Sequence, residues 1–482
     1  MMTIRRLLSL LLGICASHLV ASEPWPGETV AQATDLTPAA LSSATVSLTT
    51  AADFYEMSDA FWNANTRQLW TADARSGTYV YAFQANPAGT AFTAVHRFAI
   101  GSDGEGITQA MDDNIFYILH EGPEKVTSYR ADTGAKITDY TGMATSLVSS
   151  GNSGPEGLTF VPDASLSASG FRKGDGVPDV GTAYPASQGG LGGIFLIASQ
   201  NGGYVYAYDL PATSASATSA ATYLGRFLTG AGESSGLAFD RSNHRLFISH
   251  NTGANPIEVT SLTSTGTVGS LRLQQLAIFT GPQSGNVEGI AVTPARRPDG
   301  TPGDGWFFTV TDNDRISGGS YKSANIVWYK TLGARFTCTA GTGQSAEPGQ
   351  TLPITPAVAL LDGFRNPLIG APISYTVTSG GGTVAGGSSF TNAFGSATVG
   401  AWTLGNSSDV QTVRVDSSGV TPLSITARAI IRIITLVVLP QHLWTAIAPT
   451  DAIVGPASGG VQRIELRPSQ EAILAPIPVS AQ

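Results

Sequence analysis

A short unit that occurs five times constrains the fold of this chain more than any other feature. Each unit starts with an acid or small polar residue, then a small residue, then apolar residues: Asp59-Ala60-Phe61-Trp62, Glu105-Gly106-Ile107, Glu156-Gly157-Leu158, Ser235-Gly236-Leu237 and Glu288-Gly289-Ile290. A second apolar run in each unit ends in an acid or an amide, at Asp73, Glu121, Gln200, Asn251 and Asp312. The starts lie 46, 51, 79 and 53 residues apart. This spacing is typical of the blades of a β-propeller, which repeats equivalent positions around one axis.

The composition favours strands over helices along the chain. Only 13% of the residues are charged, 56 of the 482 are glycine, and alternating runs such as Tyr79-Val80-Tyr81-Ala82-Phe83 are common. We therefore predict an all-β protein with a five-bladed propeller over residues 54–332, with six blades as the alternative. Residues 23–53 form a leader, in which Val46-Ser47-Leu48 is either the strand that closes the ring or part of a linker. The low-complexity stretch 211–222 predicts a surface loop.

The residue composition changes near residue 335, which indicates the start of a second domain. Glycine, threonine, serine and valine alternate with turn signals over residues 335–429, enough for about seven short strands and a β-sandwich. The turn Asp362-Gly363-Phe364-Arg365-Asn366-Pro367, and Gly395 before a short strand, are similar to those of the bacterial immunoglobulin-like repeats of surface adhesins. Residues 430–482 contain one or two further strands and a Pro/Ala-rich tail, and we leave them unassigned.

The N-terminus predicts export. Arg5 and Arg6 precede the apolar run Leu7 to Ile14, and small residues follow up to Ser22, as in a signal peptide over residues 1–22. A membrane anchor is the less favoured alternative, because the run is short. Cleavage removes two arginines and no acid, which moves the net charge from −9 to about −11. We expect a secreted monomer (extracellular, periplasmic or attached to the cell surface) with no membrane span and no nucleic-acid partner.

The polar residues at the five starts form one column of equivalent positions, and the acids and amides that end the second runs form another. These two columns predict a metal site. The inner strand of a propeller blade lines the central channel, and an antiparallel neighbour brings its end beside the start of that strand. Both columns therefore converge on one mouth, where several carboxylates need cations to stay ionised. Calcium suits such oxygen ligands best, and no His/Cys cluster has zinc spacing. The predicted ligands are Asp59, Glu105, Glu121, Glu156, Glu288 and Asp312. The alternative is that these residues only accept backbone hydrogen bonds at turns.

Three other features have more ordinary explanations. The acidic loop Gly174-Asp175-Gly176-Val177-Pro178-Asp179 has oxygens spaced for calcium, but such a loop is more often a turn. His120 and His250 precede column residues, and we expect both to pack between blades. Of the two cysteines, Cys15 lies in the signal peptide, so Cys338 has no partner for an intramolecular disulfide after cleavage.

The repeats resemble the β-propeller phytases, which are secreted, calcium-dependent enzymes that hydrolyse phytate. The segments that carry the resemblance are Ser58–Trp62, Thr71–Tyr81, Asp103–Gly106, Ile118–Glu121, Gly154–Thr159 and Leu196–Tyr208. The resemblance implies that Asp59, Glu105, Glu121 and Glu156 hold calcium. It further implies that Glu121, Glu156 and Arg75 are catalytic and that Arg75 and Lys125 bind the substrate. The family has six blades, and the stretch between Phe83 and Glu105 has no room for the two that supply its phosphate-binding arginine and lysine.

Three functional hypotheses follow from these patterns. The first is a phytase-like, calcium-dependent phosphoric monoester hydrolase acting on a phosphorylated small molecule. The second is a non-catalytic, calcium-stabilised binding or adhesion protein with a surface glycan or protein as partner. The third is a metal-dependent lactonase or esterase, in which Glu288, Asn251 and Asp312 form the site. A common fold does not decide between them.

Overall fold

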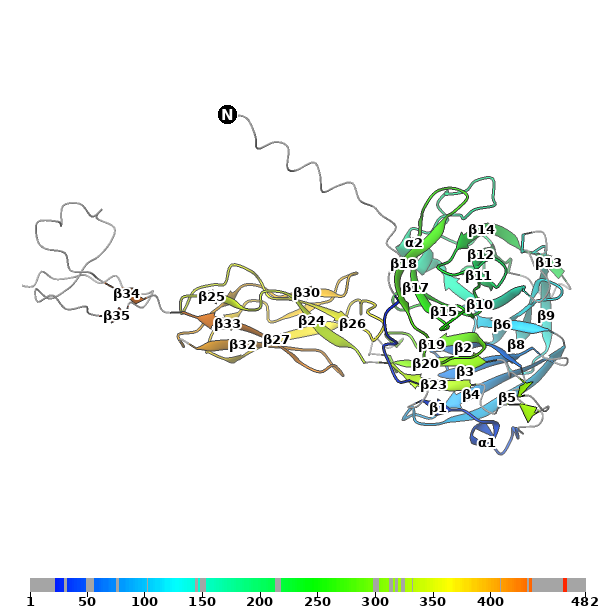
Figure 1. Ribbon diagram of the computed structural model, residues 1–482, viewed down its shortest axis with the longest axis horizontal. Helices are drawn as coiled ribbons and strands as arrows, with labels where there is room; N and C mark the ends of the chain where they lie inside the picture. The colour runs from blue at the N-terminus through cyan, green and yellow to red at the C-terminus, as the bar shows by residue number, and fades with distance from the viewer. Residues whose placement is uncertain are drawn as a thin grey trace, which may run out of the picture. The chain divides into compact units, whose positions relative to one another are not determined.

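The computed structural model describes most of residues 22–430, together with 433–435 and 463–465. The gaps lie at 30–32, 49–55, 75–77, 102, 144–145, 148–152, 213–217, 298–302, 312–314, 317–319, 322–325, 332 and 408. The chain divides into two compact units, Met1–Gly333 and Ala334–Gln482. Among the described residues the helices are α1 (Pro38–Leu41) and α2 (Asp163–Ser169), which confirms the all-β prediction (Figure 1). Neither is long and apolar enough to cross a bilayer.

The described residues of unit 1 form five sheets of four or five strands, numbered here in chain order, and one two-stranded sheet (Figure 1). Sheet 1 contains β2 (Met57–Asn63), β3 (Gln68–Asp73), β4 (Thr78–Ala85) and β5 (Phe92–Gly101). Sheet 2 contains β6 (Gly104–Gln109), β7 (Ile115–His120), β8 (Lys125–Arg130), β9 (Lys136–Thr141) and β13 (Thr218–Ala220). Sheet 3 contains β10 (Pro155–Pro162), β11 (Gly193–Ser199), β12 (Tyr204–Asp209) and β14 (Thr222–Leu228).

The last two sheets repeat the same order of antiparallel neighbours. Sheet 4 contains β15 (Leu237–Asp240), β16 (Arg245–Ser249), β17 (Ile257–Thr265) and β18 (Arg272–Phe279). Sheet 5 contains β19 (Val287–Val292), β20 (Trp306–Thr311), β23 (Ile326–Lys330) and β1 (Thr34–Asp35). The pair β21 (Arg315–Ile316) and β22 (Ser320–Tyr321) lies between β20 and β23 in sequence.

The first strands of the five sheets lie against one another in cyclic order. β2 contacts β6, β6 contacts β10, β10 contacts β15, β15 contacts β19, and β19 contacts β2. Figure 1 shows these five strands gathered together, with the later strands of each sheet further out. Buried clusters join sheets 5 and 1, 1 and 2, 2 and 3, and 3 and 4, and β10 and β11 are buried along their whole length. Trp70 and Phe116 pack between sheets 1 and 2, and Leu196 packs against Ile248 between sheets 3 and 4.

The strand that completes sheet 5 comes from the N-terminal region. Thr34 pairs with Trp328 and Asp35 with Val327. Of the two alternatives for residues 46–48, the strand is wrong: they form no strand, although Leu48 is buried in the core beside β2. A turn in which the Ser43 N–H donates to the Val46 carbonyl precedes them. Part of the predicted loop 211–222 is also a strand, because β13 pairs in parallel with β9.

In sheets 1 and 4, a tight polar turn connects the first, inner strand to the second strand. In the turn after β2, the Asn63 side chain accepts the N–H groups of Asn65 and Thr66 at 2.8 and 3.0 Å. In the turn after β15, Asp240 accepts the N–H of Ser242 at 2.8 Å. Such side-chain turns are favoured by Asn and Asp, and they reverse the chain within a few residues. They fix where β2 and β15 end.

Unit 2 has its own core. One sheet contains β24 (Arg335–Ala340), β26 (Ala357–Leu361) and β30 (Ser396–Thr398). The other contains β25 (Gln344–Ala346), β33 (Leu423–Ala429), β32 (Val410–Asp416), β27 (Pro372–Ser379) and β29 (Ser388–Phe390). β28 (Thr383–Val384) pairs with β31 (Trp402–Thr403), and β34 (Ile433–Thr435) pairs with β35 (Arg463–Glu465). Trp402, Val413 and Leu360 are fully buried in the shared core.

Candidate metal centre

The small residue after each polar start allows the inner strands to meet. A Cβ added to Gly106 would lie 2.6 Å from the Leu158 Cβ, and one on Gly157 would lie 2.6 Å from the Ser235 carbonyl. A Cβ on Gly236 would lie 2.8 Å from the Gly289 Cα, and one on Gly289 would collide with the Cα of Asp59. Each glycine thus faces the equivalent position of the next sheet. The five starts therefore come together at one end of the inner strands.

Asp59 lies at the centre of this arrangement and is fully buried. Its Oδ2 accepts the N–H of Ile107 at 3.0 Å and the N–H of Leu158 at 3.1 Å, which belong to sheets 2 and 3. Burial raises the pKa of Asp59 well above its usual value, and backbone N–H bonds oppose this rise. These bonds join Asp59 to sheets 2 and 3 through Oδ2.

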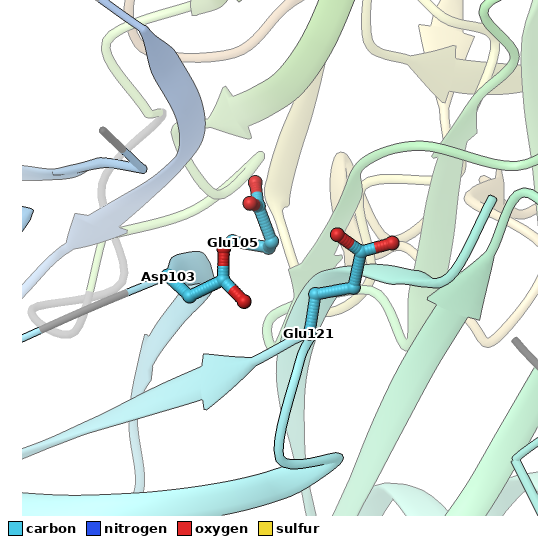
Figure 2. Close-up of side chains that lie close together, drawn as sticks. All are labelled: Asp103, Glu105 and Glu121. Atoms are coloured by element: carbon cyan, nitrogen blue, oxygen red, sulfur yellow. The ribbon is translucent and has the colours of Figure 1, made fainter. Parts of the chain in front are cut away.

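Three carboxyl groups converge at the rim, as Figure 2 shows for Asp103, Glu105 and Glu121. One oxygen of each lies within 4.8 Å of an oxygen of the other two. Asp103 has a φ of 60°, a left-handed conformation that is uncommon outside glycine. Its Oδ2 accepts the N–H of Gly122 at 2.7 Å, and its carbonyl accepts the N–H of Glu121 at 3.3 Å. The start of β6 is thereby tied to the loop after β7.

More acids surround this group, and the six together are called the carboxylate mouth: Asp103, Glu105, Glu121, Glu156, Glu233 and Glu288. Burial raises the pKa of Glu105 to about 8; a hydrogen bond from Ser58 opposes this rise, and the nearby acids add to it. Burial also raises the pKa of Glu156 well above its usual value, and Glu105 and Glu288 add to that rise. These acids cannot all ionise at neutral pH without a compensating positive charge.

The second column is only partly brought to the mouth. Glu121 reaches Glu105 and Asp103, and the Asn251 side chain donates to Glu288 Oε1 at 3.2 Å and contacts Asn286. Gln200 is held by its backbone, whose N–H donates to the Gly154 carbonyl at 3.0 Å. Asp312 lies outside the described residues.

The basic residues expected to bind substrate are not gathered at the mouth in the part of the chain that is described. Arg75 falls outside that part. Lys125 forms an ion pair with Asp139 of β9 at 3.1 Å, and Lys136 pairs with the same carboxylate at 2.5 Å. Burial opposes ionisation of Asp139, but bonds from Lys136, Thr127 and Lys125 lower its pKa to about 2. The Lys125 ammonium is thus held within sheet 2 by a carboxylate that it shares with Lys136.

Both predicted histidines are buried. The Nδ1 of His250 lies 2.8 Å from the Glu233 carbonyl oxygen, and its Nε2 lies 3.1 Å from Glu258 Oε2. His250 therefore connects the segment before β15 to β17. The acidic loop at 174–179 is also used structurally, because Asp175 accepts the N–H groups of Gly269 and Leu271, both at 2.7 Å. Asp179 pairs with Lys173 at 2.6 Å.

Sequence patterns alone did not select two acids of the mouth, Asp103 and Glu233, or the Ser58 that bonds to Glu105. Ser58 stands directly before the start Asp59, and Asp103 lies two residues before the start Glu105. Glu233 lies two residues before Ser235, the one start without an acid. The column of starts lacks an acid in the fourth unit, and Glu233 stands two residues earlier. A sequence search that allows such small shifts in position would detect it.

Comparison with known proteins assigns no family to this chain. No protein-family model and no curated protein matches it. One solved structure that is similar is a functionally unknown protein from Desulfotomaculum acetoxidans, and another is the hydrazine synthase of Kuenenia stuttgartiensis. Each is 12% identical to this chain, with a TM-score of 0.30. Each alignment covers 64% of this chain, and the two cover 83% and 78% of the other chains, respectively. Saccharomyces cerevisiae Sqt1 is 10% identical over 70% of this chain and 68% of its own, with a TM-score of 0.27. Similarities at these TM-scores carry no argument about this protein.

Proposed function

We propose that unit 1 is a five-bladed β-propeller and that unit 2 is an immunoglobulin-like sandwich. Two observations support the propeller: the cyclic contacts of β2, β6, β10, β15 and β19, and completion of sheet 5 by the N-terminal β1. Two sheets around one core, with Trp402 at its centre, support the sandwich. Secretion follows from the signal-like sequence of residues 1–22.

The carboxylate mouth fits a hard divalent cation, with calcium as the first candidate. All of its donors are oxygens, and calcium takes about six to eight oxygen ligands in flexible geometry. Asp103, Glu105 and Glu121 are the residues that would hold it, because their oxygens already lie within 4.8 Å of one another. Burial raises the pKa values of Glu105 and Glu156, the neighbouring acids add to that rise, and a bound cation would oppose it.

The activity that this site supports best is cation-dependent hydrolysis of a phosphoric monoester. A bound cation would supply Lewis-acid polarisation and would offset the negative charge of a phosphate. Glu121 is half-buried at the rim, where it can take a proton from water beside a substrate. Glu156 is buried deeper and helps to keep the mouth acidic. Arg75 remains the candidate that would contact the phosphate.

The convergence of Asp103, Glu105 and Glu121 carries this proposal, and a single substitution tests it. Glu121→Gln keeps the shape of the side chain and removes one charge from the triad. We expect it to lower hydrolysis of inositol hexakisphosphate and p-nitrophenyl phosphate by at least a hundredfold in calcium, with the melting temperature of the chelated protein unchanged or higher. Asp132→Asn, an exposed site in the β8–β9 turn, is the matched control for loss of one charge. Equal turnover by the wild type and Glu121→Gln would refute the assignment.

Two other activities have observations in their favour. The Lys125–Asp139 ion pair removes a cation from the substrate side and favours a calcium-stabilised binding protein with no catalysis. The contact between Asn251 and Glu288 favours a metal-dependent lactonase, because it brings two of the three expected residues together. Calcium-dependent melting without turnover of any ester selects the binding protein. Lactone hydrolysis without phosphatase activity selects the lactonase.

A further inference from the structure

The opposite end of the inner strands holds a cavity that the carboxylate mouth does not explain. β2 begins beside Asp59 at the mouth, and its far end at Asn63 lines a cavity of about 480 Å³. Residues at or just beyond the far ends of β6, β15 and β19 complete the lining. Cavities of roughly 300–1,000 Å³ are typical of small-molecule sites. This one is therefore large enough for a ligand of one or two rings.

Positive charge dominates this cavity. Arg241, Arg296 and Arg297 line it, and Asp113 is the one acid among the described lining residues. Asp113 is already bonded, since it accepts the side-chain N–H groups of Asn63 at 2.8 Å and Asn65 at 3.0 Å. Asp304 pairs with both Arg297 at 2.5 Å and Arg67 at 3.2 Å, so among the described residues the two carboxylates, Asp113 and Asp304, face the three lining arginines and Arg67. The two ends of the inner strands therefore have opposite sign.

Arg241 is built into the wall of the cavity. Its guanidinium donates to the carbonyls of Ala110 at 3.1 Å and Gln109 at 2.5 Å, and it lies 5.7 Å from the ring centre of Phe61. None of the carboxylates placed by the structure lies within ion-pair distance of it. Burial lowers the pKa of Arg241 to about 10, so the group is a desolvated cation that stays charged at neutral pH.

Apolar side chains supply the rest of the surface. Phe61 and Trp62 come from β2, Val292 ends β19, and Met111 lies at the rim with 59% of its surface exposed. We propose that this cavity binds a small organic anion with one sulfonate, carboxylate or phosphate group and a flat apolar body. The arginines would hold the anionic group and Phe61, Trp62 and Met111 would contact the body. This site is separate from the cation-dependent function proposed above and needs no calcium.

Isothermal titration of the full-length protein in EDTA tests the proposal with three probes. 2-Naphthalenesulfonate carries both features, 2-naphthalenemethanol has only the ring, and sodium sulfate has only the charge. We expect one saturable site for the sulfonate and at least tenfold weaker binding of the other two. No saturable binding of the sulfonate at millimolar concentration, or equal binding of sulfonate and alcohol, would overturn the proposal. Because calcium is absent, this result does not depend on the carboxylate mouth.

Two variants locate the site. Met111→Asp adds a negative charge to an exposed residue at the rim, and we expect it to weaken sulfonate binding about five- to tenfold. Val268→Asp makes a similar change at a residue of unit 1 that is 71% exposed and does not line the cavity, and binding should not change. Arg241→Met should abolish binding; should that variant fail to fold, Met111→Asp still decides. Equal affinities for the wild type and Met111→Asp would place the bound sulfonate elsewhere.

Discussion

Glu105 links the stability of this protein to pH and to calcium. In the cation-free protein its pKa is about 8, against an ordinary value of 4.5. The folded state therefore holds a proton that the unfolded chain releases, and the free energy of unfolding falls as the pH rises from 4.5 to 8. At about 1.4 kcal/mol for each pH unit above 4.5, the cost reaches about 3 kcal/mol at pH 7. Above pH 8 the contribution no longer changes.

Glu105→Gln isolates this effect because glutamine does not titrate. In EDTA we expect the variant to be about as stable as the wild type at pH 5 and more stable by about 3 kcal/mol at pH 7. For a unit of this size that is a rise in melting temperature of roughly 3–6 °C. Calcium should remove most of this difference: at a hundredfold excess over Kd it adds about 2.7 kcal/mol to the wild type and much less to the variant.

Thermal and urea unfolding between pH 5 and 9, with EDTA or calcium, measure both effects. Asp132→Asn is the control for an exposed acid and should follow the wild type throughout. The reasoning fails if the stability difference between Glu105→Gln and the wild type is the same at pH 5 and pH 8. It also fails if calcium stabilises both proteins equally.

Two further predictions concern packing. Gly236→Ala should destabilise unit 1 by about 2–4 kcal/mol in urea unfolding, because its Cβ would lie 2.8 Å from the Gly289 Cα. Gly232→Ala, where the added Cβ meets nothing within 4 Å, should change stability by less than about 1 kcal/mol, and equal losses would contradict the explanation. Asp175→Ala should cost about 1–3 kcal/mol by leaving the N–H groups of Gly269 and Leu271 unbonded. Its calcium affinity by titration should equal that of the wild type, and a loss of binding would restore the 174–179 loop as a metal site.

The sequence predicted the all-β class and the first strand of each repeat because both depend on local patterns. The alternation of apolar residues and the spacing of the repeats are written along the chain, and β2, β6, β10, β15 and β19 begin at or within two residues of the expected starts. It did not predict which segment completes sheet 5. Residues 46–48 alternate apolar and polar residues, whereas Thr34–Asp35 contains no apolar residue and becomes a strand only through its long-range pairing with β23.

The candidate site shows the same division. The columns identified Glu105, Glu121, Glu156 and Glu288 from residue type and position alone. Only the tertiary structure gave Asp59 its backbone partners, Lys125 its carboxylate and Asp103 its place at the rim, because each depends on a contact between different strands.

The glycine that follows four of the five starts summarises the difference between sequence and tertiary structure. As a sequence feature it marks a repeat, and the repeat indicates the class of fold. Its physical reason is tertiary, since each glycine lies where the backbone of the next inner strand leaves no room for a Cβ. The inner strands also have an acidic end and a basic end. No single repeat encodes this difference, because Arg241 and Arg296 come from turns that differ from unit to unit.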